Sequence, residues 1–354
     1  MKTVRRLMTY SIMKLRHLPL LEFGSMIDLE TLVDAETLQG YELLRDDSGL
    51  VELPHLARLW LLGEDRKGWL QGQATNDVRK LEGGTSSLFC FTTVTGHLMS
   101  VCEAWAAPDR ILITCPESTK EAVLRRVEQM VIMEDVTAED AGQQYTLLSV
   151  QGPSATQRLS KLVSLPSLDT GEAEIEGSAI YVLRSNRTGM GGWDLWIPTD
   201  AAKALEAVRS EFATANYESY DIARLEAGIP MFGTDMTEKT FPPEMGKAFE
   251  ERHVSYSKGC YMGQEVLMRI HSRGHTNRTW VGLTSESPIP AGAVLAQNRR
   301  SDAGIVTSSR FSPDYGHIAG AMLRNEFVFD GEIVQVQTES GPVDAEVRLM
   351  PLLR

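Results

Sequence analysis

The sequence predicts an α+β protein made of two sheet-and-helix layers followed by a small β-rich unit. Three observations support this fold class. The order strand–helix–strand–strand–helix occurs twice between residues 56 and 212. After Trp280, short strands alternate with glycine and proline turns, as in a small barrel or sandwich. The chain of 354 residues is also longer than one core usually serves, so two or three domains are expected.

The first layer is expected between residues 56 and 131. Asp65 is the expected N-cap of a short helix that follows the first strand. Ser118 and Glu121 form a capping-box pattern, and the apolar residues after them have helical spacing, so an amphipathic helix is expected to cover the sheet. The strands of this layer are predicted at 56–63, 87–94, 98–106 and 111–114.

The second layer repeats the order of elements without repeating the residues. Gly152-Pro153 and Asp200 are expected to open its two helices. Its strands are predicted at 145–150, 180–184 and 193–197. The strands of the β-rich unit are predicted near 280–284, 304–307, 317–322, 333–337 and 345–349. The stretch 214–278 fits neither period well.

The composition is that of a globular protein, with 42% hydrophobic and 23% charged residues. A formal charge of -13 argues against wholesale coating by nucleic acid, which requires a basic face. No run of about 18 apolar residues is present, so no membrane-spanning helix is expected. The four cysteines include no C-x-x-C pair, which argues against a zinc ribbon, and no metal site is predicted. A disulfide framework is not expected either, which favours a cytoplasmic location.

The N-terminal segment, residues 1–27, is treated as an extension. Its first 21 residues lack Asp and Glu and carry five Lys or Arg residues. Such a start fits an organellar transit peptide. It also fits an untidy start site, with Met8, Met13 or Met26 as the initiator.

The best candidate site on residue chemistry alone is Lys258-Gly259-Cys260-Tyr261-Met262-Gly263-Gln264-Glu265. The two glycines allow a ligand to approach the backbone closely. Lys258 beside Cys260 would lower the pKa of the thiol and supply a thiolate. Gln264 and Glu265 offer donor and acceptor edges to a flat heterocycle. Alternatively, Cys260 is a buried small hydrophobe and the glycines only mark a turn.

A second constellation lies upstream. Asp221, Arg224 and Glu226 are spaced to share a helix, and Gly228-Ile229-Pro230 is expected to end it. Arg224 offers a planar fork to a carboxylate, and Glu226 or Glu244 could accept hydrogen bonds from an amino-substituted ring. A set of ion pairs at a helix end is the alternative interpretation.

At these residues the sequence resembles known families. Lys258–Glu265 resembles the K-G-C-[YF]-x-G-Q-E signature of the YgfZ family. Arg224–Pro230 with Pro243-Glu244 is similar to a block that this family shares with the aminomethyltransferases of glycine cleavage, the T-proteins. Weaker matches are Leu70–Asp77 and Gln151-Gly152-Pro153.

The resemblance implies three domains arranged as a ring around a central channel that binds tetrahydrofolate. It implies that Arg224 contacts the folate and that Lys258, Cys260 and Tyr261 belong to the site. The resemblance and the element order together divide the chain into an extension, a first α+β domain, a second α+β domain, a signature segment and a barrel, at 1–27, 28–144, 145–245, 246–278 and 279–354.

The sequence departs from the T-protein pattern at two points. The paired aspartates that serve aminomethyl chemistry align with Ser100 and Val101, so no carboxylate is expected at that point. A folate-contacting glutamate of T-proteins aligns with Met190, which has no carboxylate oxygens. Full aminomethyltransferase activity is therefore not expected.

Three functions are compatible with these residues. The leading hypothesis is a cytoplasmic, tetrahydrofolate-binding protein that supports iron–sulfur cluster assembly or repair, with Cys260 as the operative thiol, Lys258 as its partner, and assembly proteins or client enzymes as partners. The first alternative is a folate-dependent one-carbon transferase that uses another acid or base. The second is a tRNA-associated factor, because Arg269, Arg273 and Arg278 lie close together in the sequence.

Overall fold

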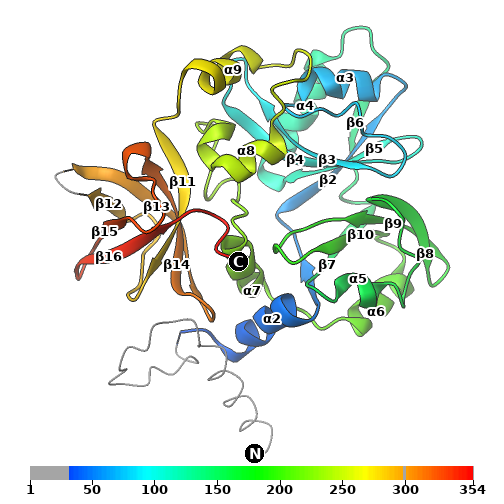
Figure 1. Ribbon diagram of the computed structural model, residues 1–354. Coiled ribbons are helices and arrows are strands. Elements are labelled where there is room, and N and C mark those ends of the chain that lie inside the picture. Colours follow the sequence, from blue (N-terminus) through cyan, green and yellow to red (C-terminus); the bar gives the residue numbers. More distant parts are fainter. Residues whose placement is uncertain (1–31, 298–299, 354) are drawn as a thin grey trace, which may run out of the picture.

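The computed structural model describes residues 32–297 and 300–353. The predicted N-terminal extension, including the three alternative initiator methionines, lies outside the described residues. The predicted fold class is confirmed: two five-stranded sheets, each with helices, precede a closed β-barrel. In Figure 1 the barrel lies on one side and the two sheets lie on the other, with α7 (Tyr217–Glu226) between them.

The first sheet has the strand order β3-β4-β5-β2-β6. Its strands are β2 (Leu56–Leu62), β3 (Ser86–Thr92), β4 (Leu98–Ala106), β5 (Ile111–Pro116) and β6 (Thr137–Asp140). Helices α3 (Arg66–Gln73) and α4 (Lys120–Met130) belong to this layer. Leu59 and Leu61 of β2 pack in the core beneath these helices, whereas Trp60 points to the opposite face. This alternation is the side-chain period of a β-strand.

The second sheet has the order β1-β7-β10-β9-β8. Its strands are β1 (Gly49–Glu52), β7 (Tyr145–Gln151), β8 (Thr170–Ile175), β9 (Ser178–Arg184) and β10 (Gly192–Pro198). Helices α5 (Ala155–Leu159) and α6 (Ala202–Glu211) accompany it. Strand β1 pairs antiparallel with β7, so residues within the range 28–144 contribute an edge strand to the second sheet.

The two sheets pack against each other through their aromatic faces. The rings of Trp60 on β2 and Trp196 on β10 lie 5.2 Å apart, and Tyr181 on β9 lies 5.4 Å from Trp60. Leu44 of α2 (Ala35–Asp46) and Tyr220 of α7 are buried in the same cluster. Because such large rings bury wide apolar areas, this cluster holds the two layers together.

The C-terminal unit is a closed barrel with the strand order β11-β14-β13-β12-β15-β16. Strand β11 pairs with both β14 and β16, which completes the closure. The strands are β11 (Arg278–Ser285), β12 (Val294–Gln297), β13 (Arg300–Ser312), β14 (Gly316–Arg324), β15 (Ile333–Thr338) and β16 (Gly341–Arg348). Closure leaves no free sheet edge in this unit.

Local helix starts differ from the sequence predictions. Helix α4 begins at Lys120 after Thr119, and no side-chain cap forms, so the predicted Ser118–Glu121 capping box is wrong. Asp65 precedes α3 as predicted but does not cap it; its carboxylate accepts from the N–H of Asp135. At Asp65, a contact with a residue 70 positions away in the sequence takes the carboxylate in place of the local cap.

Gly152 lies between β7 and α5, in the Gly152-Pro153 segment that was expected to open a helix. Its φ is +123°, and a Cβ at this position would lie 2.5 Å from the carbonyl oxygen of Asp47. Gly177 also has a positive φ, +77°, but a Cβ there would meet nothing within 4 Å. Of these two glycines, only Gly152 combines a positive φ with a close approach of another chain segment.

We therefore expect Gly152→Ala to lower the thermal midpoint more than Gly177→Ala does. Both variants bear the backbone cost of a positive φ, about 1–2 kcal/mol, but only Gly152→Ala adds a backbone collision. Thermal unfolding followed by circular dichroism measures the difference. Equal shifts would show that the contact with Asp47 relaxes freely.

Candidate functional site

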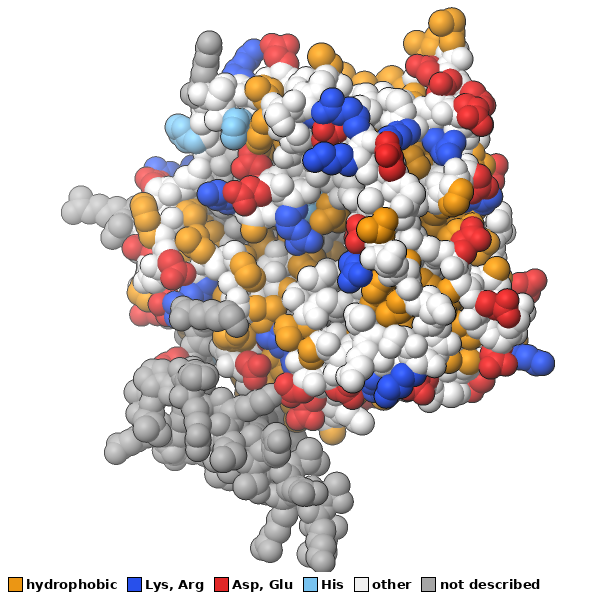
Figure 2. All heavy atoms as spheres, turned by 45° about the vertical axis from the view of Figure 1, so that its right-hand side comes forward, with side chains coloured by type: hydrophobic (Ala, Val, Ile, Leu, Met, Phe, Trp, Pro, Cys, Tyr) orange, Lys and Arg blue, Asp and Glu red, His pale blue; other side chains and the backbone are white. Residues whose placement is uncertain are grey.

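A cavity of about 800 Å³ lies where the two layers, α7 and the C-terminal tail meet. Its volume is in the range of small-molecule sites. Figure 2 shows a hollow near the middle of one face, with apolar and cationic side chains around it. Residues from every part of this junction line the cavity, among them His55, Asn76, Val101, Glu103, Glu117, Arg184, Ser185, Arg187, Tyr220, Arg224, Phe232, Phe249, Arg252 and Pro351.

Arg224 is the predicted cofactor-binding residue that the structure places at this cavity. Its guanidinium is only 1% exposed and is held by two carboxylates. Nε donates to Asp221 at 2.6 Å, and Nη1 donates to Asp235 at 2.5 Å. Nη1 also donates to the carbonyl oxygen of Ile229. The alternative interpretation, a set of ion pairs at a helix end, therefore accounts for most contacts of the Arg224 guanidinium.

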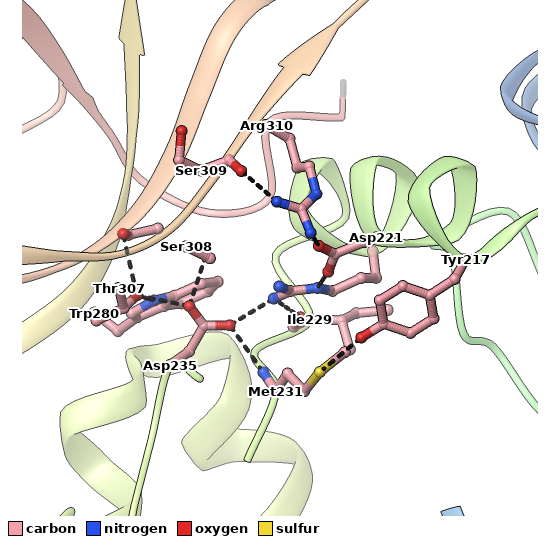
Figure 3. Close-up of polar contacts among 12 residues, drawn as sticks. Tyr217, Asp221, Ile229, Met231, Asp235, Trp280, Thr307, Ser308, Ser309 and Arg310 are labelled. Atoms are coloured by element: carbon pink, nitrogen blue, oxygen red, sulfur yellow. Dashed lines mark hydrogen bonds and ion pairs between the residues drawn. The ribbon is translucent and has the colours of Figure 1, made fainter. Parts of the chain in front are cut away.

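The two carboxylates connect Arg224 to the barrel (Figure 3). Asp235 accepts hydrogen bonds from the hydroxyls of Thr307 and Ser308 on β13, at 2.6 and 2.7 Å. Asp221 is paired with Arg310 of the same strand. This network fixes α7 against the barrel.

A second cluster lies on the cavity wall formed by the two sheets. Arg187 follows β9, and its Nη2 lies 2.6 Å from Asp194 and 3.2 Å from Glu103 of β4. Asp194 is fully buried, and the Glu103 side chain is 13% exposed. Burial raises the pKa of Glu103 to about 7, against the lowering effect of Arg187. A carboxyl group that titrates near neutrality is thus present in the cavity.

Ser100 and Val101, which the sequence resemblance pairs with the aspartates of T-proteins, are neighbours on β4. Ser100 is fully buried, and its hydroxyl contacts that of Thr119. Val101 lines the cavity. The next residue on the same face of β4 is Glu103, because alternate residues of a strand share a face. The expectation of no carboxylate holds at Val101 itself, whereas a carboxylate enters the cavity two residues further along.

The signature loop is anchored to the first layer by Lys258. Its ammonium donates to the carbonyl oxygens of Gln71, Ala74 and Asn76 at 2.7, 2.5 and 2.9 Å. Three acceptors match the three donors of a lysine. The predicted role of Lys258 as partner of the Cys260 thiolate is therefore corrected: its charge is directed to backbone carbonyls.

Cys260 is exposed, which removes the alternative of a buried hydrophobe for this thiol. Cys260 is not among the residues that line the cavity, but Asn76, which accepts from Lys258, does line it. The tip of the Lys258 side chain thus contacts one residue of the cavity lining. Tyr261 is 6% exposed and stacks under the Lys258 ammonium, at 5.1 Å, with its hydroxyl buried and unpaired among the described residues.

The remaining predicted ligand residues lie away from the cavity. Gln264 and Glu265 begin α9 (Gln264–Arg273), where Glu265 is exposed and paired with Arg269 at 2.9 Å. Glu226 is fully buried, and its carboxylate binds Arg45 of α2 at 2.8 Å. The remaining partners of Glu226 are Tyr41 and Ser312. These contacts are structural and leave no oxygen directed at the cavity.

Glu244 has a structural role as well. Its carboxylate pairs with Arg278 at 2.9 Å and accepts from the N–H of Phe241, at the start of the 3-10 helix η4 (Pro242–Met245). Thus the predicted ligand residues do not lie together: Arg224 lines the cavity, whereas none of the signature residues is part of its lining.

Three polar residues of the cavity were missed by sequence reasoning. Glu103, Arg187 and Arg252 come from β4, from the segment after β9 and from α8 (Lys247–His253). A signal for Glu103 was present in the sequence, since a lone glutamate in an apolar strand needs a partner.

Among residues 32–297 and 300–353, no group of three or more His, Cys, Asp or Glu is arranged to hold a metal ion. In the same ranges, no helix is long and apolar enough to cross a membrane.

The fold and the cavity define a three-unit protein of the T-protein architecture. The sequence model of the family described as the GCVT N-terminal domain matches residues 21–250. The chain belongs to this family. The match covers both sheet-and-helix layers and ends within α8.

Full-length relatives and a solved structure agree with this assignment. The chain is 28% identical over 327 residues to an aminomethyltransferase of Listeria monocytogenes, with 89% of each protein covered. It is 26% identical to an aminomethyltransferase of Herpetosiphon aurantiacus, again with 89% of each covered. The crystal structure of the glycine cleavage system aminomethyltransferase T of Bartonella henselae superposes with a TM-score of 0.77, at 23% identity, covering 90% of this chain and 89% of that one.

We expect Arg224→Ala to lower the free energy of unfolding by about 3–5 kcal/mol, because it leaves Asp221 and Asp235 buried without their cation. Urea unfolding without any ligand measures this loss. Arg252→Ala is the matched control. Its side chain also lines the cavity but makes no ion pair within the described residues, so the change should stay within about 0.5 kcal/mol. Equal stabilities of the two variants would contradict the structural role of Arg224.

Proposed function

We propose that this protein binds a tetrahydrofolate in the central cavity and acts as an accessory factor of the YgfZ type in iron–sulfur cluster assembly or repair in the cytoplasm. The observation that carries the proposal is the placement of Cys260. Its exposed thiol lies on a loop whose Lys258 bonds the backbone of Asn76, a residue of the cavity lining. A ligand in the cavity and an exposed thiol outside it can then act on the same partner protein.

The cavity itself supports the folate half of the proposal. Four arginines line it, namely Arg184, Arg187, Arg224 and Arg252, and the first three are already paired with carboxylates. Arg252 makes no ion pair within the described residues, so an anionic ligand gains a cation without breaking an existing pair. The glutamate tail of a folate is such an anion. Apolar lining by Phe232 and Phe249 suits its ring system.

Cys260 supports the iron–sulfur half. One thiol does not hold a cluster stably, so ligands from a partner protein must complete the set. Its exposure permits such transient ligation. The other three cysteines, Cys90, Cys102 and Cys115, are buried, and burial raises the pKa of each thiol. Cys260 is thus the thiol best suited to a partner.

A one-carbon transferase is the second candidate, and Glu103 favours it. This carboxyl group enters the cavity on the face of β4 that carries Val101 and titrates near pH 7. Such a group is suited to proton transfer. Incubation with tetrahydrofolate and an aminomethyl donor would distinguish the candidates: methylene-tetrahydrofolate and ammonia form only if the protein is a transferase.

A tRNA-associated role receives less support. Arg269 is paired with Glu265 and Arg278 with Glu244, so two of the predicted basic residues are already neutralised. Phosphate contacts require cations free to displace counterions.

We expect millimolar tetrahydrofolate to raise the thermal midpoint of the wild-type protein. A ligand that binds only the native state adds about 2.7 kcal/mol at 100 times its Kd. Free glutamate at the same concentration controls for a general anion effect. An unchanged midpoint with tetrahydrofolate would remove the folate half of the proposal.

We expect Cys260→Ser to lose most of the ability to restore iron–sulfur enzyme activity in a strain lacking the gene. Ser257→Ala, an exposed position of the same loop, is the control and should restore activity fully. Because Cys260 is exposed, the serine variant should keep the wild-type thermal midpoint. Full restoration by Cys260→Ser would show that the thiol is not the operative group.

A further inference from the structure

Residues 350–353, the tail, follow β16 and run from the barrel to the end of α7 (Figure 1). The N–H groups of Leu352 and Leu353 both donate to the carbonyl oxygen of Glu226, at 2.8 and 3.3 Å. Glu226 is the last residue of α7, and carbonyl groups in the last turn of a helix lack partners within the helix. The tail therefore caps the helix that lies between the barrel and the two layers.

Two glycines make room for the tail. A Cβ on Gly228, which follows α7, would lie 2.8 Å from Cβ of Met350 and 3.2 Å from Cα of Pro351. A Cβ on Gly189, in the segment between β9 and β10, would lie 2.6 Å from Cδ1 of Leu353. Both glycines have a positive φ, +65° and +83°. The tail thus reaches the second layer through spaces that a larger residue would fill.

Leu352 is the buried anchor of the tail. Its side chain is 7% exposed and belongs to an apolar cluster to which several parts of the chain contribute. Leu98 comes from β4 of the first layer, Leu225 from α7, and Trp280 from β11 of the barrel. Because the burial of a leucine side chain is favourable, this contact fastens the tail at the point where the barrel, α7 and the first layer meet.

The tail is also a wall of the cavity. Pro351 belongs to the lining, together with Ala227 and Gly228 at the end of α7. The walls supplied by β3, β4 and β5 are part of a five-stranded sheet. The tail, in contrast, is held by two backbone hydrogen bonds, by Leu352 and by the partly buried Met350. Local opening requires less free energy where fewer contacts must break, so the tail opens more readily than the sheet walls.

We propose that residues 350–353 act as a strap, whose docking closes the cavity and whose release opens it. Release breaks the two hydrogen bonds to Glu226, withdraws Leu352 from the shared cluster and moves Pro351 away from the cavity. The barrel stays attached to α7 during this release, because the ion pairs of Arg224 and their contacts with β13 do not involve the strap. Such a strap controls access for any ligand of the cavity, so it goes beyond the proposed function.

The test uses thiol labelling without any ligand, in a Cys260→Ser background whose remaining native thiols are buried. Ser185→Cys places a thiol on the cavity wall, at a position that is 2% exposed. The reagent is dithiobis(nitrobenzoate). Leu352→Ala should raise the labelling rate of this thiol at least about tenfold, because the strap loses its buried side chain. Leu349→Ala is the matched control: this leucine is 53% exposed, and the rate should change less than about twofold.

Hydrogen exchange of the strap supplies an independent readout. The amides of Leu352 and Leu353 are protected while they donate to the end of α7. Gly228→Ala places a methyl group against the strap and should speed the exchange of both amides at least about tenfold. Gly233→Ala is the matched control, because Gly233 has a φ of +89° and a Cβ there would meet nothing within 4 Å. It bears the same backbone cost without touching the strap, so exchange should change less than about twofold.

Cys102 and Cys115, buried in the core of the first layer, distinguish release of the strap from general unfolding. Faster labelling on the cavity wall, with these two thiols unchanged, supports the strap. Equal acceleration of all three thiols, or none in Leu352→Ala, overturns it. Exchange that is equally slow in the two glycine variants also overturns it, and this comparison decides alone if Leu352→Ala does not fold. Because no ligand is added, failure of the folate proposal leaves both readouts unchanged.

Discussion

The arrangement of the three units depends on the buried charge of Arg224. Its guanidinium is shared between Asp221 of its own helix and Asp235 of the following segment. Asp235 in turn accepts from two hydroxyls of β13, and Asp221 pairs with Arg310 of the same strand, so this charge network attaches α7 to the barrel. A buried pair stabilises little compared with apolar packing, but it tolerates only one geometry. The cavity keeps its shape because the walls around it meet at this charge.

A carboxylate enters the cavity from β4 at Glu103. Val101, which the sequence resemblance pairs with an aspartate of T-proteins, carries none, and Glu103 lies two residues further along the strand, roughly 6–7 Å away. A carboxylate displaced by that distance meets a different part of any ligand. Its pairing with Arg187 ties it to the second sheet, so the two layers define the site jointly.

Periodic patterns predicted most of the fold, because the alternation of buried and exposed residues in strands such as β2 and β4 can be recognised from neighbouring residues alone. The short strand β1 was missed: its four residues acquire their identity only from pairing with β7. The same limit applied to the site. The helix shared by Asp221, Arg224 and Glu226 was predicted, yet whether its charges face a ligand or each other depends on Asp235, Arg45 and β13. Long-range partners of this kind leave no local trace in the sequence.

Lys258 holds the signature loop in place through contacts that do not depend on which side chains surround it. Its ammonium contacts main-chain oxygens at the end of α3, and every residue type supplies such an oxygen. The anchor therefore does not depend on the side chains at 71 and 76, whereas it does depend on the ammonium of Lys258. Those two side chains can vary while the sulfur stays in one place.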